Sequence, residues 1–338
     1  MNPTTSLPAA GARIATSIVI GLAATLLFAC ADDSTLTSPS PAAGAASLGR
    51  IPAAKQDRIV FQGNRDNVGN YDIYSMLPDG TGITRLTFRI YDNWFPAMSP
   101  DGKHIVFTSK GQNPLGDIYI MKNDGSNITR LTNTTAANYH PTWSADGSKI
   151  IFTSTRDAAD PSALEVNASW EIYTMNADGS NVKRITNDAV GEFEPQLSPD
   201  GTKIAFASDR DHLDSDVTTE LYVMNVDGTN IHRLTWQIGR VGTPSFDPAG
   251  KRIVYYTTAA GTASGIYIYD PMYRAPLRLT FNNGASDVHP TWSPDGKQIA
   301  YSHWELNGGE IFKMNADGTG VTALTSDLFV DMYPRWGR

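Results

Sequence analysis

The 338-residue chain contains a single cysteine, Cys30, so no disulfide bond can form within it. It also lacks the Gly-x-Ser-x-Gly turn that carries the nucleophile of α/β-hydrolases, which argues against a peptidase of that kind. The apolar run from Ile14 to Ala29 has about sixteen residues, whereas a membrane-spanning helix needs about twenty. Stability must therefore come from packing, and the apolar run suits a signal peptide.

The first thirty residues are typical of an exported, lipidated protein. Arg13 precedes the apolar run, and Leu27-Phe28-Ala29-Cys30 resembles the lipobox of bacterial lipoproteins, in which the cysteine follows the cleavage site and receives the lipid. We therefore predict a signal peptide at residues 1–29 and lipidation of Cys30. Ala31 follows the cysteine, which resembles an outer-membrane rather than an inner-membrane address.

Residues 30–57 are poor in aromatic residues and rich in Ser, Pro and Ala. Such a composition cannot bury enough apolar surface to fold. We predict a disordered tether with a reach of roughly 30 Å between the lipid and the folded domain.

A tight-turn phrase, Ser-Pro-Asp-Gly or a close relative, recurs through the remainder of the chain. Its glycines lie 45, 54, 49 and 46 residues apart: Gly102, Gly147, Gly201, Gly250 and Gly296. A second phrase that ends in Asp-Gly alternates with the first, and only the fifth unit lacks it. The chain is therefore a series of repeats of about 45 residues.

Each unit is predicted to contain four short strands, because β-branched and aromatic runs alternate with turn residues. Asp-Gly turns join the first strand to the second and the third to the fourth. Four-stranded units of this length indicate propeller blades, and six second strands are present. The segment from Met332 to Arg338 resembles a lone first strand. We expect an all-β, six-bladed β-propeller over residues 58–338, closed where this last strand joins the first blade.

The repeats P-x-W-S-P-D-G-K-x-I-A-F-x-S, D/E-I-Y-x-M-N-x-D-G and R-L-T resemble those of the TolB-like C-terminal β-propeller, a WD-like repeat family. The resemblance covers nearly all of residues 58–338. It implies a partner protein at the propeller mouth, namely a peptidoglycan-associated lipoprotein. The family's N-terminal α/β domain has no room in this chain, and TolB is soluble, whereas a lipid anchor is predicted here. Similar repeats occur in prolyl-oligopeptidase-like peptidases and oligogalacturonate lyases.

One face of the propeller is expected to hold the uniform Asp-Gly turns, and the other to hold loops of variable length. Variable loops on a rigid scaffold usually carry function. Acidic residues far outnumber basic ones on this loop face, so we expect a cation or a basic protein segment to bind there, and not nucleic acid. Arg65, Arg156 and Arg210 are expected to brace the loops through ion pairs with nearby third-strand carboxylates.

A proline lies near the start of the first strand in every unit, and the residue before a proline favours an extended backbone. We therefore expect six extended residues at the channel mouth: Phe95, His140, Glu194, Thr243, His289 and Tyr333. Two positions before five of them lie polar residues: Asn93, Asn138, Glu192, Asp287 and Asp331. These eleven residues form the predicted binding site.

The sequence contains two candidate metal sites. His140, His289 and Glu194 could bind a transition metal, although blades three and six lie on opposite sides of the ring. Asp209, Asp211, Asp214 and Asp216 could hold calcium, but their spacing is not that of an EF-hand loop.

The sequence thus favours a non-catalytic, lipid-anchored interaction platform in the bacterial cell envelope, facing the periplasm or the cell surface. The alternatives are an envelope lyase or hydrolase that acts on a glycan, and a propeller that binds a metal or a small ligand.

Overall fold

The computed structural model describes residues 57–65, 69–88, 91–162, 169–188, 190–211, 218–236, 239–259, 263–273, 275–281, 284–306 and 308–337. The predicted signal peptide, Cys30 and the tether lie outside these ranges. Within them all regular structure is β-strand, and no helix could cross a membrane. In chain order the strands are β1 (Arg58–Gly63), β2 (Asp72–Met76), β3 (Thr84–Arg85), β4 (Asn93–Met98), β5 (His104–Ser109), β6 (Asp117–Lys122), β7 (Thr129–Arg130), β8 (Asn138–Trp143), β9 (Lys149–Ser154), β10 (Glu171–Asn176), β11 (Lys183–Arg184), β12 (Glu192–Leu197), β13 (Lys203–Ser208), β14 (Glu220–Asn225), β15 (His232–Arg233), β16 (Gly239–Phe246), β17 (Ile253–Ala259), β18 (Gly265–Tyr269), β19 (Leu277–Arg278), β20 (Ser286–Trp292), β21 (Gln298–Glu305), β22 (Gly308–Asn315), β23 (Thr322–Ala323) and β24 (Asp331–Gly337).

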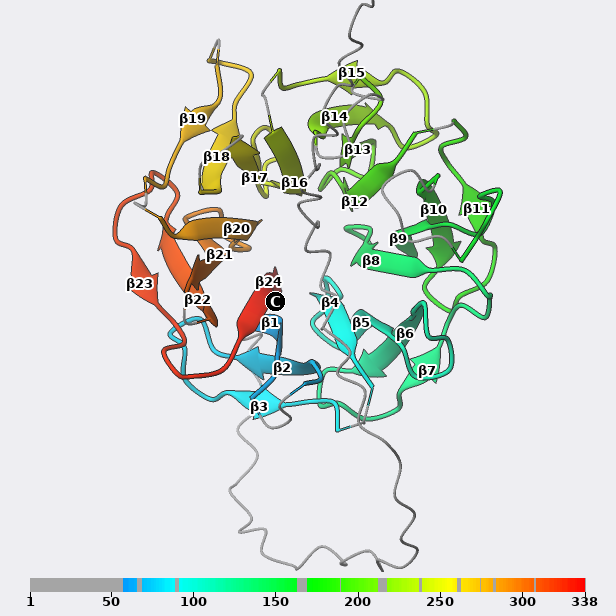
Figure 1. Cartoon of the computed structure of the whole chain (residues 1–338), viewed down its shortest axis with the longest axis horizontal. Coiled ribbons are helices and arrows are strands. Elements are labelled where there is room, and N and C mark those ends of the chain that lie inside the picture. The colour runs from blue at the N-terminus through cyan, green and yellow to red at the C-terminus, as the bar shows by residue number, and fades with distance from the viewer. Residues whose placement is uncertain are drawn as a thin grey trace, which may run out of the picture. The chain divides into compact units, whose positions relative to one another are not determined.

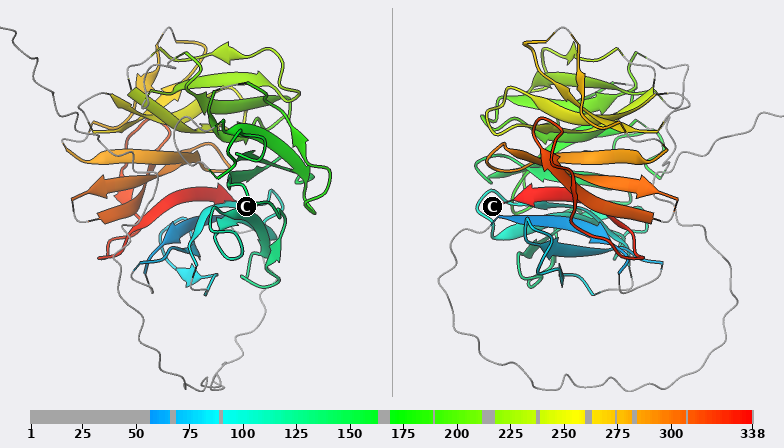
Figure 2. Two further views of the ribbon diagram at one scale, coloured as in Figure 1. Left: turned by 45° about the vertical axis from the view of Figure 1, so that its right-hand side comes forward. Right: turned by 90° about the vertical axis from the view of Figure 1, so that its left-hand side faces the viewer.

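The strands form six four-stranded antiparallel sheets arranged as blades around a central channel (Figure 1). Blade 1 has the order β24-β1-β2-β3, so the C-terminal strand pairs with the first strand and closes the ring. Figure 2 shows β24 lying beside β1 when the ring is seen from its edge. The predicted six-bladed propeller and its closure are confirmed, and β1 has a strand partner on both sides.

A pair of aromatic rings, stacked in five blades and tilted in blade 6, joins the second and third strands of every blade. Ring centroids lie 5.6–6.1 Å apart in the pairs Phe61–Tyr74, Phe107–Tyr119, Phe152–Tyr173, Phe206–Tyr222, Tyr255–Tyr267 and Tyr301–Phe312. Each pair packs against the apolar residues of a neighbouring blade, for example Tyr301 against Val254 and Ile266 of blade 5. The core is therefore a ring of layers between blades, and each layer depends on both of its neighbours.

The Asp-Gly hairpins form for local reasons. Gly147 has a φ of 71°, which favours glycine, and its N–H donates to the carbonyl of Ser144 at 2.9 Å. The Ser144 hydroxyl donates to Asp146 at 2.6 Å and accepts from the N–H of Lys149 at 2.9 Å. Every turn of this kind thus fixes the start of the second strand.

Candidate functional site

The six residues before the prolines lie in the first strands of six different blades and surround the channel. Their backbone is not extended, as we had expected, but left-handed, with φ between 46° and 56°. The register between first and second strands shifts at this point in every blade, which is a β-bulge. The left-handed backbone has a physical cause, because it directs the N–H of the residue before the proline toward the preceding blade.

Hydrogen bonds between blades show what this turn achieves. Phe95 N donates to Gln62 Oε1 at 2.9 Å, and Tyr333 N donates to Ser302 Oγ at 3.0 Å. Thr243 N donates to the carboxylate of Glu194. Each donor belongs to one blade and each acceptor to the blade before it, so these bonds connect neighbouring blades around the channel.

Aromatic rings from four blades converge in the channel. The ring of Phe95 lies 4.0 Å from that of His140 and 4.7 Å from that of Tyr333, measured between centroids. The rings of His289 and Tyr333 are stacked at 3.5 Å. His140 and His289 therefore lie in one aromatic cluster, in which the rings of Phe95 and Tyr333 meet edge to face.

Burial sets the charge of both histidines. It lowers the pKa of His140 to about 4, although the carboxylate of Glu194 opposes the shift. It also lowers the pKa of His289 well below its usual value, and Arg240 and Arg335 add to that effect. Both imidazoles are therefore neutral at pH 7.

Several buried polar atoms in the channel have no hydrogen-bond partner. They are Nδ1 and Nε2 of His140, Oε1 of Glu194 and Nη1 of Arg335. His140 Nε2 lies 3.7 Å from Glu194 Oε1, beyond hydrogen-bond distance. The channel therefore contains neutral and charged groups whose hydrogen-bonding capacity is unused.

The five polar residues two positions earlier have a different role, because each is already hydrogen-bonded, two of them across a blade boundary and three within their own blade. Asn93 and Asn138 donate to the carboxylates of Asp72 and Asp117 at 3.2 and 3.0 Å. The other three contact cations: Glu192 accepts from Arg210 at 2.6 Å, Asp287 from His303 at 2.7 Å and Asp331 from Arg65 at 2.9 Å. All five side chains are buried and already paired.

The loop arginines were expected to pair with third-strand carboxylates, and that expectation is wrong. Arg65 and Arg210 bind the first-strand residues Asp331 and Glu192, and Arg156 Nη2 donates to Asn138 Oδ1 at 2.7 Å. The third-strand carboxylates instead pair with the arginines of the R-L-T phrases. The pairs are Arg85–Asp72, Arg130–Asp117, Arg184–Glu171 and Arg233–Glu220.

The structure does not gather His140, His289 and Glu194 into a metal site. Among the described residues, two groups of three have ligand atoms within 4.8 Å of one another: Glu171, Asp188 and Glu192, and Glu310, Asp327 and Asp331. Of the four residues proposed for calcium, Asp214 and Asp216 lie outside the described ranges. Asp209 accepts from Gly191 N at 2.8 Å, and Asp211 pairs with Arg233 at 3.0 Å.

Sequence reasoning missed three residues of the channel, Arg240, Tyr256 and Arg335. Arg335 had a signal, because the residue directly after the proline is small or uncharged in the other first strands: Ala97, Thr142, Gln196, Ser245 and Thr291. An arginine at this one position is a departure from the repeat.

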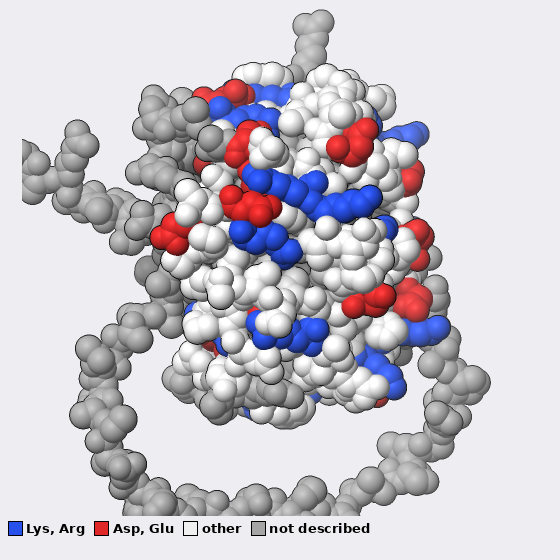
Figure 3. Space-filling view, turned by 90° about the vertical axis from the view of Figure 1, so that its right-hand side faces the viewer, with Lys and Arg blue, Asp and Glu red and all other residues white. Residues whose placement is uncertain are grey.

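Loop carboxylates remain accessible even where they are paired. The side chains of Asp157, Asp188 and Asp211 are 48%, 40% and 46% exposed while they contact Arg184, Arg210 and Arg233. On the edge of the ring shown in Figure 3, acidic and basic residues are interspersed.

These features define a closed six-bladed β-propeller with a cluster of aromatic rings in its channel. The model of the TolB beta propeller domain matches residues 91–161 and 212–337, more than half of the chain, so the chain belongs to this family. A TolB homolog of Chlorobium luteolum is 27% identical over 152 residues, which are 45% of this chain and 31% of that protein. The Tol-Pal system protein TolB of Anaeromyxobacter dehalogenans is 44% identical over 45 residues, 13% of this chain and 10% of the relative. The chain thus spans about a third or less of the length of these relatives.

Solved structures share the fold. TolB from Acinetobacter baumannii superposes with a TM-score of 0.69 at 24% identity, covering 83% of this chain and 66% of that one. An oligogalacturonate lyase in complex with manganese superposes with a TM-score of 0.55 at 16% identity, covering 78% of this chain and 73% of the lyase.

Proposed function

We propose that the protein is a lipid-anchored, non-catalytic propeller of the bacterial cell envelope that binds a partner protein through its channel mouth and acidic loop face. The relatives named as Tol-Pal system proteins support an interaction role in the envelope. By the same relationship, the partner is a peptidoglycan-associated lipoprotein or a basic segment of another envelope protein.

The observation that carries this proposal is the unused hydrogen-bonding capacity of the channel. A buried polar group without a partner costs about 1–3 kcal/mol. His140, Glu194 and Arg335 contribute four such atoms in the channel. A partner segment that enters the mouth and supplies donors and acceptors would recover part of that free energy on binding.

The test is capture of the peptidoglycan-associated lipoprotein from cross-linked envelopes, with captured proteins identified by mass spectrometry. We expect the double variant His140→Gln, Glu194→Gln to lose it, because both side chains keep their size but change their polarity. His232→Ala is the matched control, because His232 lies in β15 at the rim of the ring. Equal capture by wild type and double variant, with unchanged melting temperatures, would overturn the mouth as the binding site.

A metal or small-ligand role is the second candidate, and the neutral, unpartnered imidazole of His140 favours it. A glycan-degrading role would need such a site as well. Elemental analysis of the purified full chain, compared with His140→Gln, tests it. Stoichiometric metal that disappears in the variant would favour this role over the interaction platform.

A further inference from the structure

An arginine in the fourth strand lies opposite the aromatic residue of the third strand in blades 1 to 5. The registered pairs are Tyr74–Arg85, Tyr119–Arg130, Tyr173–Arg184, Tyr222–Arg233 and Tyr267–Arg278. Blade 6 has Phe312 opposite Ala323 at the same register. The side chain that covers this place in five blades is therefore reduced to a methyl group in the sixth.

The acceptors for the missing arginine are still present in blade 6. In blade 3, Arg184 Nη2 donates to Glu171 Oε1 at 2.5 Å, and Asp188 N donates to the same oxygen at 3.2 Å. In blade 6, Asp327 N donates to Glu310 Oε1 at 2.9 Å. Glu310 thus keeps the geometry of Glu171 without the guanidinium.

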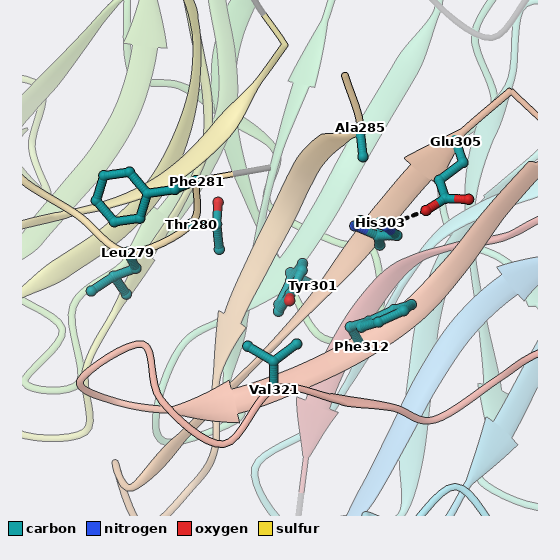
Figure 4. A pocket seen from close by; sticks show the side chains of 9 residues that line it. All are labelled: Leu279, Thr280, Phe281, Ala285, Tyr301, His303, Glu305, Phe312 and Val321. Carbon is teal, nitrogen blue, oxygen red and sulfur yellow. Dashed lines mark hydrogen bonds and ion pairs between the residues drawn. The ribbon is translucent and has the colours of Figure 1, made fainter. Parts of the chain in front are cut away.

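A cavity of about 480 Å³ opens beside Phe312, the residue that lies opposite Ala323. Tyr301, Phe312 and Val321 form its wall on blade 6, and Thr280 and Phe281 lie across from them on blade 5 (Figure 4). His303 and Glu305 also line the cavity, and their side chains point toward each other in Figure 4. The cavity therefore combines aromatic walls with polar groups on one side.

Carboxylates outnumber cations around this place. Asp287 and Glu305 flank His303 at 2.7 and 3.2 Å. Arg65 contacts Asp327 at 2.6 Å and also pairs with Asp331, next to Glu310. Counted together with Glu310, these residues make five carboxylates against Arg65 and His303, and His303 and Glu305 among them line the cavity. This excess of negative charge favours a cationic ligand.

We propose that this cavity binds the guanidinium group of an arginine from a partner protein, in the place that a blade's own arginine takes in blades 1 to 5. The guanidinium would stack on Phe312 and pair with Glu310, as a planar, delocalised cation with several fixed donors can. The inference deepens the proposed function and rests on it, because it specifies the chemistry of the partner segment and the blade that it contacts.

The test uses the purified full chain and three capped tripeptides, Gly-Arg-Gly, Gly-Lys-Gly and Gly-citrulline-Gly, with binding followed by NMR titration. We expect the arginine peptide to bind at least about ten times more tightly than the lysine peptide, because lysine cannot make the planar, bidentate contact. The citrulline peptide, which has the shape without the charge, should not bind. Equal binding of the arginine and citrulline peptides would overturn the proposal.

Ala323→Arg is the decisive variant, because it should fill the cavity with the blade's own arginine. We expect it to weaken binding of the arginine peptide at least tenfold and to raise the melting temperature. Thr322→Arg adds the same charge to the neighbouring exposed position and should leave binding unchanged. Full binding by a stably folded Ala323→Arg variant would refute the site. The capture experiment with the His140→Gln, Glu194→Gln variant tests the channel mouth and does not depend on this cavity. Failure of the arginine site would therefore leave the proposed function standing, and the two proposals can be refuted separately.

Discussion

Replacement of Glu192 by glutamine should stabilise the protein at neutral pH. Glu192 is fully buried, and one oxygen each of Glu192, Glu171 and Asp188 lie within 4.8 Å of one another. Oε2 of Glu192 and Oε2 of Glu171 have no hydrogen-bond partner. At the two preceding blade boundaries an asparagine occupies this place and donates to the facing carboxylate, as Asn138 does. Glutamine would restore such a donor.

The magnitude follows from the charge of Glu192. Burial, with Asp188 and Glu171 adding to it, raises the pKa of Glu192 to about 9, against 4.5 for the free side chain. Between pH 4.5 and pH 9 the folded state therefore holds a proton on Glu192 that the unfolded state has lost. The contribution of Glu192 to the free energy of unfolding is at its most favourable below pH 4.5 and falls as pH rises toward 9. Between pH 4.5 and pH 7 the loss is at most about 3 kcal/mol.

The expected gain is smaller than this maximum, because glutamine must keep its amide oxygen toward Arg210 to preserve that hydrogen bond. We expect Glu192→Gln to raise the free energy of unfolding by about 1–2 kcal/mol at pH 7 to 8 and to change it little at pH 4.5. Urea denaturation of both proteins at pH 4.5, 6, 7 and 8 measures this. Asn138→Asp makes the opposite change one boundary earlier and should destabilise increasingly as pH rises. A Glu192→Gln variant that is less stable than wild type at pH 8 would refute the reasoning.

Three further predictions address the core, the closure and the anchor. Phe206→Ala removes a fully buried ring stacked on Tyr222 and should lower the free energy of unfolding by about 3–5 kcal/mol in urea denaturation; a loss below about 1 kcal/mol would contradict the layered core. Deletion of residues 331–338 removes β24 and exposes the edge of β1, so light scattering should detect oligomers; a stable monomer would show that closure is dispensable. Cys30→Ala should abolish labelling by radioactive palmitate and release the protein into the soluble fraction; retained label would place the lipid elsewhere.

The fold was predictable because its determinants are local and repeated. The turn at Gly147 needs only a glycine and the Ser144 and Asp146 side chains beside it, and similar phrases recur along the chain. The orphan strand near Met332 then had only one available partner, the unpaired edge of β1. Repetition of a local signal therefore determined both the number of blades and the closure of the ring.

The channel could not be predicted in the same way, because its geometry depends on contacts between blades. The rule for residues that precede proline describes an isolated dipeptide, whereas Phe95 is left-handed in a bulge where its N–H reaches Gln62 of the preceding blade. Arg210 likewise pairs with Glu192, which lies 18 residues before it in sequence. Which side chains pair across a blade cannot be read from spacing alone.

A residue that differs from its counterparts in the other blades marks a place where the fold does not determine the choice of residue. The propeller requires the same element from every blade, so a residue that breaks the repeat without a structural replacement is retained for another reason or tolerated by drift. Ala323 breaks the repeat of arginines in the fourth strands, and Glu192 stands where blades 2 and 3 have asparagine and blades 6 and 1 have Asp287 and Asp331. We expect the substitution of either Glu192 or Ala323 to raise stability. The two substitutions differ in their effect. Glu192→Gln would supply a missing hydrogen bond at a blade boundary, whereas Ala323→Arg would fill a cavity that faces solvent. We expect Ala323→Arg to gain stability and lose arginine binding, and Glu192→Gln to gain stability and keep arginine binding. That outcome would show that Ala323 serves function, whereas Glu192 does not.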